Sequence, residues 1–159
     1  LCTGFAVVEL DQETGKYEIL EYLGVADCGT VMYPDGLGAQ MHGGAVMGFG
    51  MASSERHVYD PKLGIPANRG LYQQKPPTYL DVPSKLEWAA VNKPDPQSPF
   101  GSRGVGEPPL GAAASAVASA ISDAMGGHLF NRIPVTPDMI VNVLSGQPQS
   151  HKALQVNTQ

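Results

Sequence analysis

The sequence has little charge and no long apolar run, and each shortage excludes a class of protein. Only 16% of its residues are charged, against about 25% in an ordinary soluble domain, and acidic residues outnumber basic ones by 15 to 10. An acidic chain without a basic patch lacks the electrostatic footprint of a nucleic-acid-binding protein. The longest stretch of low polarity, residues 109–120, is too short to span a bilayer. We therefore expect no nucleic-acid partner and no membrane segment.

Cysteine is represented only by Cys2 and Cys28. Two thiols cannot complete a four-cysteine iron–sulfur centre or a closed zinc site, and they do not form a disulfide framework. The histidines show no metal-ligand spacing. The chain starts at Leu1 and enters a strand pattern without the basic leader of a signal peptide. We expect free thiols, no metal ion bound directly by side chains, and a piece or subunit of a larger protein.

Glycine and proline, in contrast, are abundant. The chain of 159 residues contains 19 glycines and 14 prolines, well above the usual ~7% and ~5%. The glycines follow no triplet period, which excludes a collagen helix, and an apolar content of 42% argues against disorder. A chain with these properties typically buries much of its surface against a partner or cofactor, and its length predicts one domain.

The first third of the chain predicts a hairpin followed by a helix. Residues 5–10 and 16–25 alternate apolar and polar side chains, and Gly15 in the turn between them suits a positive φ. Glycines and a proline mark residues 27–38 as a loop. An apolar, glycine-studded segment then predicts a helix over residues 40–55.

The remainder predicts one strand and two helices. A strand is expected over residues 81–92, and an alanine- and serine-rich helix over residues 112–125 that ends at a glycine pair. A helix over residues 136–144 begins with a threonine cap and a proline at its first position. The fold class is therefore α+β, with one lobe over residues 1–144 and a polar C-terminal tail over residues 145–159.

The helix over residues 40–55 carries more glycine than an isolated helix tolerates. Each glycine inside a helix costs up to ~1 kcal/mol relative to alanine. A compensating reason is needed, either the close approach of another backbone or a flat ligand, and tight packing against another helix is the favoured explanation. The glycines concerned are Gly43, Gly44, Gly48 and Gly50.

Residues 103–111, Arg-Gly-Val-Gly-Glu-Pro-Pro-Leu-Gly, carry the clearest functional signal. Glu107 precedes Pro108, which favours an extended backbone at Glu107, and the two prolines suit the first turn of the following helix. The carboxylate is thus expected at the helix N-terminus, where the helix dipole favours a negative charge. Nearby glycines leave bare N–H groups for an anionic or planar ligand. From the residues alone, a helix-capping glutamate after a turn is the favoured interpretation of Glu107, and a ligand-facing carboxylate is the alternative.

Two motifs together resemble the molybdenum hydroxylases, the family of xanthine oxidase and aldehyde oxidoreductase. Residues 104–110, Gly-Val-Gly-Glu-Pro-Pro-Leu, resemble the signature around the active-site glutamate of that family. Residues 27–50 resemble its pattern D-x-G … N-P … G-Q-x-x-G-G-x-x-Q-G-x-G. The chain departs from this pattern at Tyr33, Ala39 and Met47, where Asn, Gly and Gln are usual. The resemblance extends from the first hairpin to the last helix.

The resemblance implies the C-terminal lobe of a molybdopterin-binding domain. Such enzymes oxidise an aldehyde or an electron-poor heteroaromatic carbon with water as the oxygen source. Glu107 falls at the position of the base that takes a proton from the molybdenum-bound hydroxyl group, and Gln40 falls where family members contact the pterin. The rest of the cofactor-contacting set would be Ser102, Arg103, Gly104, Val105 and Gly106.

The resemblance also implies cofactors and partners. Molybdenum would be held by a molybdopterin, in its cytosine dinucleotide form, while 2Fe–2S clusters and FAD would lie on partner chains. The partners would be the rest of the molybdenum subunit, an iron–sulfur subunit and a flavin subunit, together with a small-molecule substrate. The complex would be cytoplasmic, or periplasmic if exported with a partner subunit, and this chain alone would be inactive.

Two alternatives stand beside the enzymatic interpretation. The chain could be a non-catalytic lobe that completes an assembly and binds cofactor, or a family member with altered chemistry, such as a reductase or a hydratase. Glu107 favours the catalytic interpretation, because a purely structural lobe does not need a carboxylate at that position. His42, two residues after Gln40, is a weaker candidate for the same site.

Overall fold

A computed structural model describes residues 1–151 and contains a mixed sheet of three strands in the order β1-β2-β3. Strands β1 (Cys2–Leu10) and β2 (Tyr17–Ala26) form the predicted antiparallel hairpin, with Gly15 at φ 70° in its turn. Strand β3 (Lys85–Ala90) pairs with β2 in parallel. It is shorter than the expected strand over residues 81–92, because the 3-10 helix η1 (Tyr79–Asp81) precedes it.

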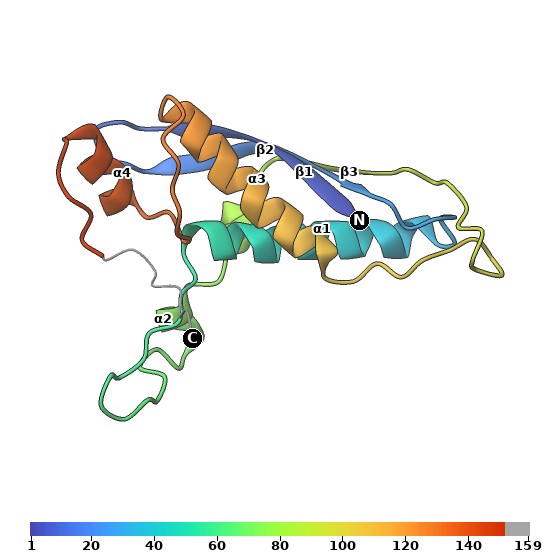
Figure 1. Ribbon diagram of the computed structural model, residues 1–159, viewed down its shortest axis with the longest axis horizontal. Helices are drawn as coiled ribbons and strands as arrows, with labels where there is room; N and C mark the ends of the chain where they lie inside the picture. Colours follow the sequence, from blue (N-terminus) through green and yellow to red (C-terminus); the bar gives the residue numbers. More distant parts are fainter. Residues whose placement is uncertain (152–159) are drawn as a thin grey trace, which may run out of the picture.

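Two long helices pack together on one face of the sheet (Figure 1). Helix α1 (Pro34–Ser53) lies against α3 (Pro108–Ala124), which in turn crosses β1 and β2. The short helices α2 (Leu71–Gln74) and α4 (Pro137–Leu144) lie at the periphery. The α+β fold class is confirmed, as are the helices that follow the Pro-Pro and Thr-Pro signals.

Helix α1 begins at Pro34, and the prediction of a loop as far as residue 38 was wrong. Gly36 and Gly38 look like loop residues in the sequence, but both serve packing. A Cβ atom on Gly38 would lie 2.7 Å from Nε1 of Trp88, and one on Gly36 would lie 2.5 Å from the ring of Tyr33. The glycines therefore make room for aromatic rings, and the helix gains a turn and a half at its start.

The expected close approach at the glycines of α1 is confirmed at three positions. A Cβ atom on Gly48 would lie 2.6 Å from Cβ of Ala113 in α3, and one on Gly44 would lie 2.7 Å from Cβ of Pro109. Gly50 is crowded by Pro77 in the same way. Gly43, in contrast, faces open space, so helix packing does not explain it.

The hydrophobic core lies between the sheet and the two long helices. The rings of Tyr22 and Phe49 meet edge to face at 5.2 Å, and Val117 and Ile121 of α3 are fully buried beside them. On the opposite face of the sheet, Phe5 and Val7 are at least half exposed. The body thus has one well-packed face and one face of mixed apolar and charged side chains that the described residues leave open.

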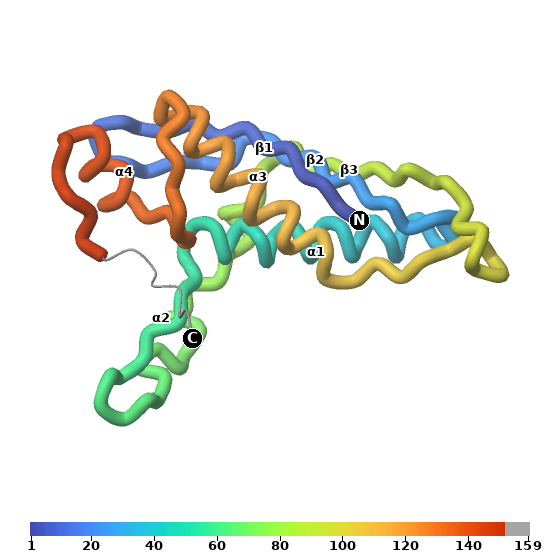
Figure 2. Tube along the Cα trace, in the orientation of Figure 1, coloured from blue at the N-terminus to red at the C-terminus, as the bar shows by residue number. Residues whose placement is uncertain are grey.

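Residues 56–83 form an arm whose first part, residues 56–75, projects from the body (Figure 2), while residues 76–83 return along β2 and the end of α1. The buried side chain of Asn68 organises it by accepting from the N–H of Val58 and donating to the carbonyl of Arg56. The arm is therefore ordered by its own hydrogen bonds. More than half of the surface of six large side chains is nevertheless exposed on it: Tyr59, Leu63, Leu71, Tyr72, Tyr79 and Leu80.

The described part of the predicted polar tail returns along α4. The Gln149 amide donates to the carbonyl of Met139, and the Ser150 hydroxyl donates to Asp138. The rest of that tail, residues 152–159, lies outside the described residues. Within residues 1–151, no helix has the combination of length and hydropathy that a membrane crossing requires.

Candidate functional site

Glu107 lies directly before α3, as predicted, but its backbone is helical (φ −86°, ψ −14°). The expectation of an extended backbone was wrong, because the Glu107 carbonyl accepts a hydrogen bond from the N–H of Leu110 and so closes the first turn. The carboxylate is exposed and makes no capping hydrogen bond. It lies at the N-terminus of a 17-residue helix, the end at which the helix dipole attracts an anionic group. A capping role for this side chain therefore finds no support in the geometry.

The loop before Glu107 presents unused hydrogen-bond donors. Among the described residues, none accepts a hydrogen bond from the N–H groups of Gly104, Val105 or Gly106. The Cβ positions of Gly104 and Gly106 are open. Bare N–H groups beside a helix N-terminus are a favourable environment for an anionic or polar ligand edge.

Gln40 lies on the second turn of α1, where its exposed side chain makes no hydrogen bond within residues 1–151. It is one turn before Gly44, on the same helix face, and Gly44 packs against Pro109. The structure therefore brings Gln40 to the side of α1 on which α3 begins. His42 differs from Gln40 because its Nε2 atom is buried without a partner among these residues.

Ser102 and Arg103 are tied to the end of β2. Ser102 forms an isolated β-bridge with Gly29, and the Arg103 N–H donates to the carbonyl of Cys28 at 2.7 Å. The Arg103 guanidinium donates to Asp95 at 2.7 Å and to Asp27 at 2.8 Å. The hydrogen bond that Arg103 donates to Asp95 and the negative charge of Asp27 raise the pKa of Arg103. The N–H of residue 97 and the Arg103 guanidinium lower the pKa of the Asp95 carboxyl.

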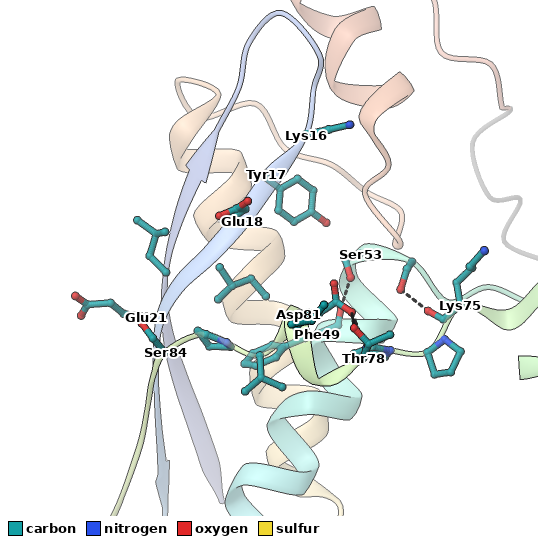
Figure 3. A pocket seen from close by; sticks show the side chains of 18 of the residues that line it. Lys16, Tyr17, Glu18, Glu21, Phe49, Ser53, Lys75, Thr78, Asp81 and Ser84 are labelled. Atoms are coloured by element: carbon teal, nitrogen blue, oxygen red, sulfur yellow. Dashed lines mark hydrogen bonds between the residues drawn. The ribbon is translucent and has the colours of Figure 1, made fainter. Parts of the chain in front are cut away.

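A groove of about 980 Å³ lies elsewhere, between β2, the end of α1 and residues 75–85. In Figure 3, Tyr17 extends from β2 into this groove, and hydrogen bonds join Thr78 and Asp81 on the opposite wall. None of the predicted site residues lines it. The sequence gives no signal for this groove, because its walls come from segments that meet only in the folded chain.

No metal-binding cluster of His, Cys, Asp and Glu side chains is found among residues 1–151. The candidate residues are Gln40, the loop amides and Glu107, which offer hydrogen-bond donors and one carboxylate. This donor set has the chemistry of the class of surfaces that face a polar or anionic ligand edge.

Comparisons with known proteins agree with that class. Residues 1–83 match the molybdopterin cofactor-binding domain family. The chain is 38% identical over 136 residues to the xanthine dehydrogenase molybdenum-binding subunit of Escherichia coli O157:H7, covering 86% of this chain and 18% of that protein. It is 32% identical over 142 residues to the nicotine 6-hydroxylase large subunit of Paenarthrobacter nicotinovorans, with 88% and 17% covered.

A solved structure shows the same fold. Quinoline 2-oxidoreductase from Pseudomonas putida 86 superposes with a TM-score of 0.82 at 30% identity, over 90% of this chain and 18% of that one. The chain belongs to the molybdopterin cofactor-binding domain family of the molybdenum hydroxylases. It spans less than a fifth of the length of these relatives.

Proposed function

We propose that this chain is the glutamate-bearing C-terminal lobe of the molybdenum subunit of a molybdenum-dependent oxidoreductase. The substrate class is an aldehyde or an electron-poor heteroaromatic carbon, which is oxidised with oxygen from water. The observation that carries this proposal is the exposed, uncapped Glu107 carboxylate beside the unused amides of residues 104–106 at the start of α3.

The residues present fit a molybdopterin. Gln40 offers an amide that can donate and accept at once, and Gly104, Val105 and Gly106 offer N–H groups without competing partners in the described chain. The open Cβ sides of Gly43, Gly104 and Gly106 leave space for a planar group. Ser102, fixed by its bridge to Gly29, sets the start of this surface.

When bound, the molybdenum cofactor supplies the two-electron oxidation with water as oxygen donor. The role of this chain in the reaction is to hold and move a proton. Glu107 would accept one proton at a carboxylate oxygen, as a general base does, and such a positioned base contributes about 10²–10⁴-fold to the rate. Gln40 and the loop amides would hold the cofactor edge within reach of Glu107.

The proposal extends to the assembly. The exposed side chains of Phe5 and Val7 on the sheet, and the six exposed large side chains of the arm, support contacts with the rest of the molybdenum subunit. We assign the iron–sulfur clusters and FAD to separate subunits, molybdopterin to its cytosine dinucleotide form, and the complex to the cytoplasm. Free Cys2 and Cys28 are consistent with a reducing compartment.

Metal and pterin analysis of the purified complex tests the proposal. We expect molybdenum and pterin in the complex, and mass spectrometry should identify a larger molybdenum-binding chain, an iron–sulfur chain and a flavin chain. Gln40→Ala should lower the molybdenum and pterin content. Gln12→Ala, in the exposed hairpin turn, is the matched control and should not. A purified complex that lacks molybdenum and pterin would refute the proposal.

A further inference from the structure

The loop that carries Glu107 is rich in glycine, yet it is anchored at both ends. After Glu107, Pro109 is buried against Gly44 of α1. Before it, Val105 packs on a small core cluster that includes Met41. Between Arg103 and Glu107 only three residues intervene, and two of them are glycine. The position of Glu107 therefore depends on these two contacts and on how firmly Arg103 is held at the start of the loop.

Arg103 is held by two segments, the residues that follow β2 and the loop that contains Asp95. Its guanidinium bridges Asp27, after β2, and Asp95, in the preceding loop. Its own N–H donates to Cys28 at 2.7 Å, and the neighbouring Gly101 carbonyl accepts from Thr30 at 2.7 Å. The start of the loop is thus hydrogen-bonded to the residues that follow β2, and the Arg103 guanidinium pairs with the carboxylates of Asp27 and Asp95 beside it.

The carboxylates are themselves fixed. Oδ1 of Asp95 accepts from the N–H of Gln97 at 2.9 Å, and Oδ1 of Asp27 accepts from the N–H of Gly29 at 3.3 Å. The Asp27 and Asp95 side chains are 27% and 18% exposed, so solvent screens these pairs less than it screens a fully exposed pair. Because two carboxylates already balance the guanidinium charge, Arg103 attracts an anionic cofactor group less than an unpaired arginine would.

We propose that Arg103 is a positioning residue: its bridge between Asp27 and Asp95 fixes the loop of residues 104–107, and with it the Glu107 carboxylate and the free amides. This inference rests on the proposed function, since it assigns the arginine to the support of the site and not to contact with the cofactor. Misplacement of a reacting group by about 1 Å can cost ~10²-fold in rate.

The test compares Arg103→Met with Arg103→Lys in the cofactor-loaded complex. Arg103→Met should lower kcat by about 10- to 100-fold with KM and molybdenum content little changed, and Arg103→Lys, which keeps the charge, should restore much of the loss. Hydrogen exchange of the residue 103 amide and the Thr30 amide should quicken roughly 2- to 30-fold in Arg103→Met, as expected for the loss of two ion pairs. Asp95→Asn, which keeps the Asp27 pair, should give a smaller effect.

Lys85→Met is the matched control, because it removes the exposed pair of Lys85 with Glu21 and should leave both readouts unchanged. Unchanged exchange at Thr30 in Arg103→Met would overturn the proposal. So would loss of molybdenum with unchanged exchange, which would make Arg103 a cofactor ligand. Failure of the proposed function would show separately, as normal turnover of Glu107→Gln in the same preparation.

Discussion

The contact between α1 and α3 predicts opposite effects for two alanine substitutions in one helix. Gly48 faces α3, where an added Cβ would lie 2.6 Å from Cβ of Ala113 and 2.9 Å from the backbone nitrogen of Ala114. Gly43 faces open space. Both substitutions gain helix propensity, about 0.5–1 kcal/mol, but only Gly48→Ala creates a clash.

The difference between the two variants therefore isolates the packing contribution. Overpacking a tight contact costs roughly 1–3 kcal/mol, and the atoms that a Cβ at Gly48 would meet belong to helix backbone and a stiff methyl group, which cannot move aside. We expect Gly43→Ala to unfold at a slightly higher temperature than the natural protein. Gly48→Ala should melt lower than Gly43→Ala by roughly 4–8 °C, as about 2 kcal/mol gives at this chain length.

Thermal unfolding followed by circular dichroism of the two purified variants measures this difference. Gly43 and Gly48 lie in the same helix, so each alanine variant serves as the control for the other. If Gly43→Ala and Gly48→Ala shift the melting temperature equally, the glycines do not serve the close approach of α3, and the packing argument is refuted.

Two further predictions concern a buried hydroxyl and the loop glycines. Tyr22 is 3% exposed and its hydroxyl has no partner among residues 1–151, so Tyr22→Phe should leave the free energy of unfolding unchanged or raise it. Burial raises the Tyr22 pKa from about 10 to about 12. The free energy of unfolding should therefore be highest below pH ~10 and fall as the pH rises to ~12, and it should fall less steeply in Tyr22→Phe. Equal slopes of the free energy of unfolding against pH, from denaturant titrations of the two proteins, would contradict this. Gly104→Ala should fold normally, because its Cβ side is open, yet lower the molybdenum content; Gly29→Ala, at φ 67° and against the carbonyl of Gly101, should lower the melting temperature instead. If Gly104→Ala and Gly29→Ala change the melting temperature and the molybdenum content in the same way, then Gly104 does not serve binding while Gly29 serves folding, and this prediction is contradicted.

Local signals predicted the hairpin, α3 and α4, because turn glycines and N-terminal prolines act over a few residues. The start of α1 was missed because Gly36 and Gly38 are explained only by aromatic rings that pack on them, and Trp88 comes from a strand 50 residues further along the chain. The parallel pairing of β3 with β2 likewise depends on contacts distant in sequence. Hydrophobic periodicity carries no information about such partners.

The candidate site shows the same division. The residues around Glu107 could be identified from their order along the chain. The two prolines indicated the first turn of α3, which begins at Pro108, four residues before the predicted range of 112–125. Two other features could not be predicted from the sequence. The helical backbone of Glu107 depends on the hydrogen bond that its carbonyl accepts from the N–H of Leu110, and the ion pairs of Arg103 include Asp27, 76 residues away. Whether each residue contacts cofactor stays a prediction.

Turnover of Glu107→Gln in the intact complex tests the central claim most directly. Glutamine keeps the size and much of the hydrogen-bonding shape of glutamate but removes the base. We predict a fall in kcat of about 10²–10⁴-fold or more, with molybdenum, iron and flavin contents equal to those of the natural complex. Normal turnover of Glu107→Gln at equal molybdenum content would show that this carboxylate is not the base.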